Sequence, residues 1–253
     1  MKHSVSYWPF EAIPLEEFAE KILPLGYTGI DLLHPEQARR VRPLGIECPV
    51  SAAPEHESGL GCIERAFNRK EHHPTLHQIY EKLIPEAAEA GISQVICFSG
   101  NREGLDDVTG MENCAAGIAP LLPLAERNGV TLIMELLNSD VDHPDYQCDH
   151  SDWAAGLASL LDSPNFGVLY DIYHMQIMEG DIIQTIRRHH RHFTHYHTAG
   201  NPGRNEIGPN QELNYPAICR AIRETGFEGY LAQEFVPLGN PLAALQEAID
   251  LCS

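Results

Sequence analysis

The stretch "MENCAAGIAPLLPLAERNGVTLIMELL" (111–137) contains one complete helix-to-strand unit. Its first part has apolar residues at helical spacing, and Gly129 follows it, where a left-handed residue commonly ends a helix. The apolar run over 131–137 begins two residues later and predicts a buried strand. We therefore predict a helix that ends at Gly129 and leads directly into a strand.

The same pattern recurs along the chain. Helical patterns over 14–26, 75–91 and 215–226 likewise close at a glycine, and each is followed by a strand-like run. The predicted strands span 3–8, 29–33, 46–52, 94–99, 131–137, 166–172, 193–199 and 230–236. A regular alternation of helices and strands predicts an α/β fold with a parallel sheet.

The number of strand units favours a barrel. Eight units over 253 residues average about 32 residues each, as a (β/α)8 barrel requires. A doubly wound open sheet usually carries a glycine-rich phosphate turn after its first strand, and "SYWPFEAIP" (6–14) contains none. We therefore predict an α/β fold with a single (β/α)8 TIM barrel over residues 1–253.

Composition narrows the class of partner. The chain has 36 acidic and 17 basic residues and a net charge of −19, which repels nucleic acid and anionic membrane surfaces. The sequence contains no bilayer-spanning run, and "MKHSVSYWPFEAIP" (1–14) does not read as a secretory signal. Seven cysteines without a CxxC pair predict reduced thiols. We expect a cytoplasmic protein that binds neither nucleic acid nor membrane.

Metal-ligating side chains stand late in four consecutive predicted strands. They are Glu135, Asp171, His197 and Glu234, separated by 36, 26 and 37 residues. In a barrel, active groups come from the carboxyl ends of the strands, so these four would meet. Three carboxylates repel one another unless a cation lies between them. The donor set suits one Mn²⁺ or Mg²⁺ ion, with Co²⁺ and Zn²⁺ as further candidates.

Each of these residues has a simpler interpretation. A glutamate late in a strand is often a rim charge, Asp171 can cap the next helix, and His197 can be a core histidine. Recurrence at equivalent positions of successive repeats favours the metal site.

Two further residues and one segment are predicted near this site. His174, three residues after Asp171, would open the following loop and reach a ligand beside the metal. Arg204 can clamp a carboxylate, a hydroxyl pair or a phosphate, and its alternative is a salt bridge to Glu206 or a neighbouring acid. The irregular stretch 53–73 is predicted as a loop at the mouth of the barrel.

The second half of the chain resembles the xylose isomerase-like TIM-barrel superfamily, and within it the hydroxypyruvate isomerase and D-tagatose 3-epimerase relatives. The matching stretches are "IMELLNS" (133–139), "YDIYHMQIMEGD" (170–181), "HYHTAGNPGRNE" (195–206), "ELNYPAI" (212–218) and "GFEGYLAQEFVP" (226–237). The first half matches only in its β/α layout.

This resemblance implies roles for individual residues. The implied metal ligands are Glu135, Asp171, His197 and Glu234, and Glu135 and Glu234 are also the implied acid/base pair on opposite faces of the substrate. The residues expected to contact substrate are His174, Arg204, Asn138 and His56. His197 is the epimerase-like choice, since hydroxypyruvate isomerases tend to carry glutamine there. This departure and the long loop 138–150, which is rich in ionisable groups, affect the identity of the substrate more than the class of reaction.

These roles predict a divalent-metal-dependent isomerase or epimerase that acts on a small sugar or hydroxy-keto acid through an enediolate. Return of the proton to the adjacent carbon gives isomerisation, and return to the opposite face of the same carbon gives epimerisation. The alternatives are a metal-dependent lyase or dehydratase, an endonuclease IV-like nuclease and a non-catalytic sugar-binding barrel. The oligomeric state stays open, with a homo-oligomer among the alternatives.

Overall fold

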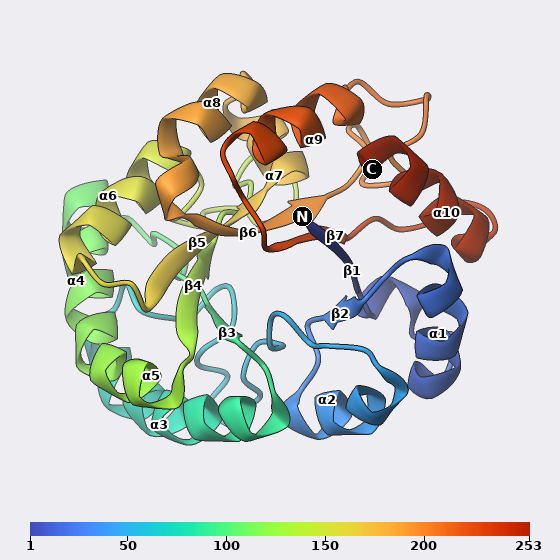
Figure 1. Cartoon of the computed structure of the whole chain (residues 1–253). Coiled ribbons are helices and arrows are strands. Elements are labelled where there is room, and N and C mark those ends of the chain that lie inside the picture. The colour runs from blue at the N-terminus through green and yellow to red at the C-terminus, as the bar shows by residue number, and fades with distance from the viewer.

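The computed structural model describes residues 1–253 and contains a parallel sheet that curls into a barrel (Figure 1). Seven strands follow the order β2-β1-β7-β6-β5-β4-β3. They are β1 (Lys2–Ser6), β2 (Gly29–Asp31), β3 (Gln94–Cys97), β4 (Thr131–Glu135), β5 (Phe166–Asp171), β6 (Phe193–Thr198) and β7 (Tyr230–Gln233). Every pair of neighbours in this order is parallel, as the predicted fold requires.

The eighth predicted strand, over 46–52, is present only as isolated bridges. The N–H of Ile30 donates to the carbonyl of Glu47 at 2.9 Å, and the N–H of Ser51 donates to the carbonyl of Gln94 at 2.9 Å. Pro49 has no N–H to donate, which breaks a regular ladder at this position. The segment nevertheless contacts both β2 and β3, so it closes the (β/α)8 barrel.

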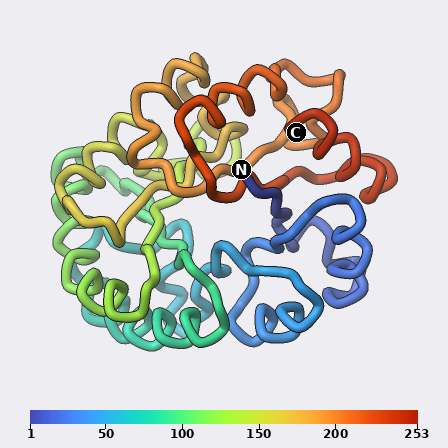
Figure 2. Tube along the Cα trace, in the orientation of Figure 1, coloured from blue at the N-terminus to red at the C-terminus, as the bar shows by residue number.

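Helices surround the strands on the outside (Figure 1), and the colours of the Cα trace run once round the ring from blue to red (Figure 2). The α-helices are α1 (Leu15–Ile22), α2 (Pro35–Val41), α3 (His73–Ala90), α4 (Asp107–Ile118), α5 (Leu122–Asn128), α6 (Ser151–Leu161), α7 (Ile172–Met178), α8 (Ile182–His189), α9 (Tyr215–Glu224) and α10 (Pro241–Cys252). None of them combines the length and the apolar character that crossing a bilayer needs.

The predicted helix ends are confirmed. Gly91 and Gly129 follow α3 and α5 with φ angles of +83° and +64°, the left-handed region that favours glycine. The helix predicted to end at Gly129 is divided, because a short 3₁₀ turn over Ala119–Leu121 separates α4 from α5. Pro120 lies in this turn, and a proline interrupts the hydrogen bonding of a continuous helix.

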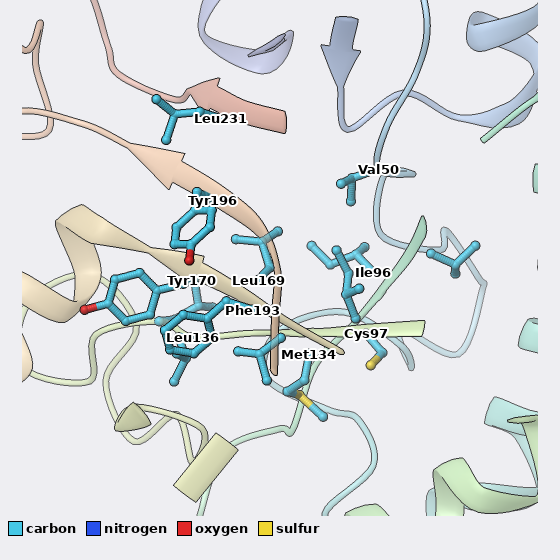
Figure 3. Close-up of a cluster of buried hydrophobic side chains, with 14 of the residues drawn as sticks. Val50, Ile96, Cys97, Met134, Leu136, Leu169, Tyr170, Phe193, Tyr196 and Leu231 are labelled. Atoms are coloured by element: carbon cyan, nitrogen blue, oxygen red, sulfur yellow. The ribbon is translucent and has the colours of Figure 1, made fainter. Parts of the chain in front are cut away.

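A buried apolar core fills the spaces between the strands and around them. Figure 3 shows part of it, in which Ile96, Met134, Leu169 and Tyr196 come from four neighbouring strands. All four side chains are buried. Successive residues of a strand point to opposite faces, so Leu169 and Asp171 share one face of β5. The core therefore holds the strand ends that carry the polar residues described below.

We expect Leu169→Ala to lower the free energy of unfolding by about 2–5 kcal/mol, since it removes a fully buried side chain and leaves a cavity. Leu160→Ala is the matched control, because Leu160 is 54% exposed, and its effect should stay below about 0.5 kcal/mol. Urea unfolding followed by circular dichroism measures both. Equal effects of the two substitutions would contradict this description of the core.

Candidate active site and metal centre

The four side chains predicted to bind a cation meet at one end of the barrel. Glu135 and Asp171 are the last residues of β4 and β5, His197 lies one residue before the end of β6, and Glu234 directly follows β7. All four are buried, and their ligand atoms lie within 4.8 Å of one another. Three carboxylates and one imidazole thus form a compact cluster at the carboxyl ends of successive strands.

Strand pairing explains this convergence. Asp171 and His197 are direct partners in the parallel pair β5–β6. The N–H of Glu234 donates to the carbonyl of Thr198 at 2.8 Å, which ties the end of β7 to the end of β6. Parallel neighbours end at the same edge of a sheet, so residues one repeat apart in sequence become neighbours in space.

His197 and Arg204 supply the positive charge in the cluster. Nδ1 of His197 lies 3.2 Å from Oε2 of Glu234 and 3.4 Å from Oε1 of Glu135. Nη2 of Arg204 donates to Oε2 of Glu234 at 2.8 Å. Burial by itself lowers the pKa of His197, but the neighbouring carboxylates, Glu234 first, outweigh burial and hold that pKa well above its ordinary value.

The two glutamates have different surroundings. Glu234 accepts hydrogen bonds on both oxygens, from Nε1 of Trp8 at 2.9 Å and from Arg204. Burial opposes ionisation, but the attraction of His197 and Arg204 outweighs it and holds the pKa of Glu234 well below its usual range. Glu135 has only His197 as a polar partner, and burial raises the pKa of Glu135. One carboxylate is therefore firmly held and the other is freer.

A divalent cation fits this donor set. Burial and the charge on Glu234 raise the pKa of Asp171 to about 7, so the three carboxylates do not ionise together easily. A cation between them would turn repulsion into attraction, and Mn²⁺ and Mg²⁺ accept three carboxylates and one imidazole as ligands. The residues that would hold such an ion are Glu135, Asp171, His197 and Glu234.

Asp171 also caps a helix, as its simpler interpretation proposed. Its Oδ1 accepts the backbone N–H of His174 at 3.0 Å at the start of α7. The cap turns the chain into a helix directly after β5, so the prediction that His174 opens a loop is wrong: His174 lies within α7. Capping uses one carboxylate oxygen and leaves the other for a cation.

Asn138 fixes the orientation of the buried His174 ring. Oδ1 of Asn138 accepts the N–H groups of Val141 and Asp142 at 3.0 and 2.8 Å, so its Nδ2 is the atom that donates to Nδ1 of His174 at 2.6 Å. The neutral ring then carries its proton on Nε2. That atom is buried, has no hydrogen-bond partner and lies 3.8 Å from Oδ2 of Asp171. His174 therefore presents a free N–H beside the cluster.

Arg204 lies on the loop after β6 and points back to the cluster. Its guanidinium carbon stands 5.2 Å from the centre of the Trp8 ring and 5.6 Å from that of Tyr173, which allows cation–π contact with both. The predicted alternative, a salt bridge to Glu206 or a neighbouring acid, is formed with Glu234 at 2.8 Å and not with Glu206. The carboxylate of Glu206 accepts backbone N–H groups of the 238–239 turn instead.

His56 is not brought to the cluster. Its exposed ring lies 2.7 Å from the hydroxyl of Ser58 and lines a separate surface hollow with His34 and Lys82. The 53–73 segment itself lies at the mouth of the barrel, as predicted, because Ala53 and Ile63 line the cavity described next.

A cavity of about 400 Å³ opens beside the cluster. Its polar or charged lining residues are Trp8, Glu135, His143, Arg204 and Glu234. The remaining lining residues are Leu32, Ala52, Ala53, Cys62, Ile63, Ile96, Phe98 and Leu137. The cavity therefore has a mostly apolar lining with a few charged groups that come from the cluster or contact it, which suits a small molecule that carries polar groups.

Three residues that contact the cluster were not predicted. Asp31 is the last residue of β2 and contacts His197, but it stands in the middle of the predicted strand over 29–33, so the strand-end rule did not select it. His195 precedes His197 by two positions and so shares its face of β6. Trp8 gave no signal in the sequence, because its contact with Glu234 depends on the pairing of β1 with β7.

Comparison with known proteins finds relatives over most of the chain. A family model described as "Xylose isomerase-like TIM barrel" matches residues 19–252. A Homo sapiens protein named "Putative hydroxypyruvate isomerase" is 31% identical over 243 residues, 90% of this chain and 82% of that protein. A 2-oxo-tetronate isomerase of Cupriavidus necator is 31% identical over 121 residues, 48% of this chain and 46% of that protein.

Solved structures share the fold at low identity. A D-psicose 3-epimerase from Clostridium cellulolyticum H10, with D-tagatose, has a TM-score of 0.81 at 18% identity and covers 100% of this chain and 98% of its own. A structure from Brucella melitensis described as an AP endonuclease of family 2 has a TM-score of 0.85 at 23% identity, with 97% of each chain covered. Together with the family model and the human relative, these matches show that the chain belongs to the xylose isomerase-like TIM barrel family.

Proposed function

We propose that this chain is a divalent-metal-dependent isomerase or epimerase acting on a small sugar or hydroxy-keto acid. The buried cluster of Glu135, Asp171, His197 and Glu234, with ligand atoms within 4.8 Å of one another, carries this proposal. The names of the relatives support it, since they are a hydroxypyruvate isomerase and a 2-oxo-tetronate isomerase. The shared fold with a D-psicose 3-epimerase is consistent with it.

Glu135 and Glu234 are the proposed proton-transfer pair. One carboxylate removes a proton from the carbon next to a carbonyl, the substrate becomes an enediolate, and the same or the facing carboxylate returns a proton. A bound divalent cation supplies positive charge that polarises a carbonyl oxygen. Both glutamates are buried beside the cavity, where the exclusion of water strengthens their electrostatic effect.

Arg204 and His174 are the proposed substrate contacts, supported by their free donors. Nε of Arg204 is buried without a hydrogen-bond partner, while Nη2 is bonded to Glu234. Nε2 of His174 is likewise buried and unpartnered. Asn138 acts in this proposal through His174, whose ring it orients. His56 is left out, since it lies in a different hollow.

A small substrate is favoured over nucleic acid. The likeness to the Brucella melitensis AP endonuclease structure is one of fold at 23% identity, and a net charge of −19 opposes binding to a phosphate backbone. Tight DNA binding at moderate salt would reverse this ranking. A lyase or dehydratase would form the same enediolate but expel a leaving group, and product analysis separates that reaction from isomerisation.

We also propose a cytoplasmic location, supported by the state of the cysteines. All seven thiols are unpaired, and six of them are buried. Such thiols are typical of proteins kept in a reducing compartment.

Purified protein that has not met a chelator should contain about one divalent ion per chain by elemental analysis. Removal of the ion should abolish activity and lower the thermal midpoint, since a ligand at 100 times its Kd stabilises a fold by about 2.7 kcal/mol. Addition of Mn²⁺ or Mg²⁺ should restore both. A metal-free chain that responds to neither ion would refute the metal-dependent proposal.

Glu135→Gln and Glu234→Gln should each lower deuterium uptake from solvent into substrate by at least about 10²-fold, because each removes a group that transfers the proton. A panel of ketoses, aldoses and hydroxypyruvate with Mn²⁺ first identifies the substrate. Glu112→Gln, on the exposed face of α4, is the control that should leave exchange unchanged. Mn²⁺ titration of each variant separates loss of proton transfer from loss of the ion. Undiminished exchange in both site variants would exclude these residues as bases.

Arg204→Lys should raise KM by about tenfold, or ~1.4 kcal/mol, because lysine keeps the charge but loses the planar donors and the contact with two aromatic rings. Steady-state kinetics on the identified substrate measures this change. The exposed Arg188 provides the control Arg188→Lys, for which KM should not change. An unaltered KM in Arg204→Lys would argue that the guanidinium does not contact substrate.

A further inference from the structure

A second buried group of titratable side chains lies against the proposed metal ligands. Asp31, at the end of β2, is fully buried. Its Oδ2 is 2.5 Å from Nε2 of His195 and 3.3 Å from Nε2 of His197, and its Oδ1 has no hydrogen-bond partner. The proton-transfer chemistry proposed above does not use Asp31 or His195.

The geometry determines which nitrogen of His197 carries a proton. An ionised carboxylate accepts hydrogen bonds and cannot donate them. Nε2 of His197 is hydrogen-bonded to Oδ2 of Asp31 at 3.3 Å, so this nitrogen must donate. Nε2 of His195 lies 2.5 Å from the same oxygen but makes no hydrogen bond. When His197 is neutral, its lone pair is then on Nδ1, the atom that faces Glu135 and Glu234 at 3.4 and 3.2 Å.

A second cation between these residues fits less well. Two ligands about 2.0–2.1 Å from a tetrahedral ion lie roughly 3.3 Å apart. Nε2 of His195 and Oδ2 of Asp31 are only 2.5 Å apart, which is too close for two ligands of one ion. His197 also has its other nitrogen directed at the cluster, so the group is better described as a carboxylate that accepts a hydrogen bond from His197 and lies against His195.

We propose that Asp31 is a positioning residue for the metal centre: it holds His197 by Nε2–H and so presents Nδ1 to the cation. His195 lies against the same carboxylate without a hydrogen bond to it. This inference rests on the proposed metal-dependent function. Removing such an outer partner of a metal-ligating histidine typically weakens metal binding by about 10–100-fold.

Mn²⁺ binding to the metal-free protein, measured by calorimetry, tests the proposal without an activity assay. Asp31→Asn should weaken Mn²⁺ binding by about 10–100-fold, because a neutral amide holds the N–H of His197 less strongly than a carboxylate does and can turn its NH₂ group toward it. His195→Gln leaves the hydrogen bond from His197 to Asp31 in place, and its Mn²⁺ affinity should stay within about threefold of wild type. Asp149→Asn is the matched control, since it alters another buried carboxylate, one paired with Arg102, and should leave Mn²⁺ affinity unchanged.

Nitrogen-15 NMR of ring-labelled histidine in the Zn²⁺-loaded wild type provides a second readout that requires no variant of Asp31. The His197 signal, identified by its loss in His197→Gln, should show a proton on Nε2 and none on Nδ1. This spectrum decides the question even if Asp31→Asn does not fold.

The outcomes separate the two proposals. Wild type that binds neither Mn²⁺ nor Zn²⁺ overturns the metal-dependent function and this inference with it. Wild type that binds Mn²⁺, with Asp31→Asn within about threefold of it, overturns the positioning role alone. A proton on Nδ1 of His197 in the Zn²⁺ form does the same.

Discussion

Repulsion among three buried carboxylates is the constraint on which the rest of this site depends. Glu135, Asp171 and Glu234 lie where water is excluded, and charges interact more strongly there than in solvent. His197 and Arg204 offset part of the repulsion from within the cluster. A cation would offset the remaining repulsion. The arrangement that opposes simultaneous ionisation of the three carboxylates therefore also favours metal binding. The three carboxylates repel one another, and the barrel, which is stabilised by its apolar core, holds them together.

The scaffold is regular where the cluster needs precision and irregular where a substrate needs room. Strands β4 to β7 are all paired in parallel, with one register shift between β5 and β6 at Val168/Leu169, and the ends of these strands carry all four proposed ligands. Opposite them, the 46–52 segment forms only bridges, and the chain that follows it lines the cavity through Ala52, Ala53 and Ile63. Side chains on paired strands have little freedom to move, whereas loops can vary in shape without disturbing the barrel.

Arg204 connects the parts of the site. Its guanidinium contacts the rings of Trp8, which follows β1, and Tyr173 in α7, and it donates a hydrogen bond to Glu234 after β7. The same contacts make the two proposed proton-transfer groups unequal, because Glu234 has donors on both oxygens while Glu135 has His197 alone. An acid/base pair with unequal surroundings is suited to a reaction in which the two carboxylates have different tasks. Asp31 extends the arrangement one layer deeper by holding His197 from the opposite side.

The sequence by itself determined seven of the strands, four of the helical segments, the barrel and the strand-end places of the four proposed ligands. Hydrophobic periodicity and helix-ending glycines are local signals, and one β/α repeat per strand brings equivalent strand ends to the same edge of the barrel. The prediction of a helix over 75–91 therefore lies close to α3 (His73–Ala90). Only the tertiary structure decided that Asp31 reaches His197 across 166 positions, that Trp8 reaches Glu234 across 226, and that His56 lies in a separate hollow. The two long-range contacts depend on how the barrel closes, and the place of His56 depends on the path of an irregular loop. Neither can be predicted from the periodic pattern of the sequence.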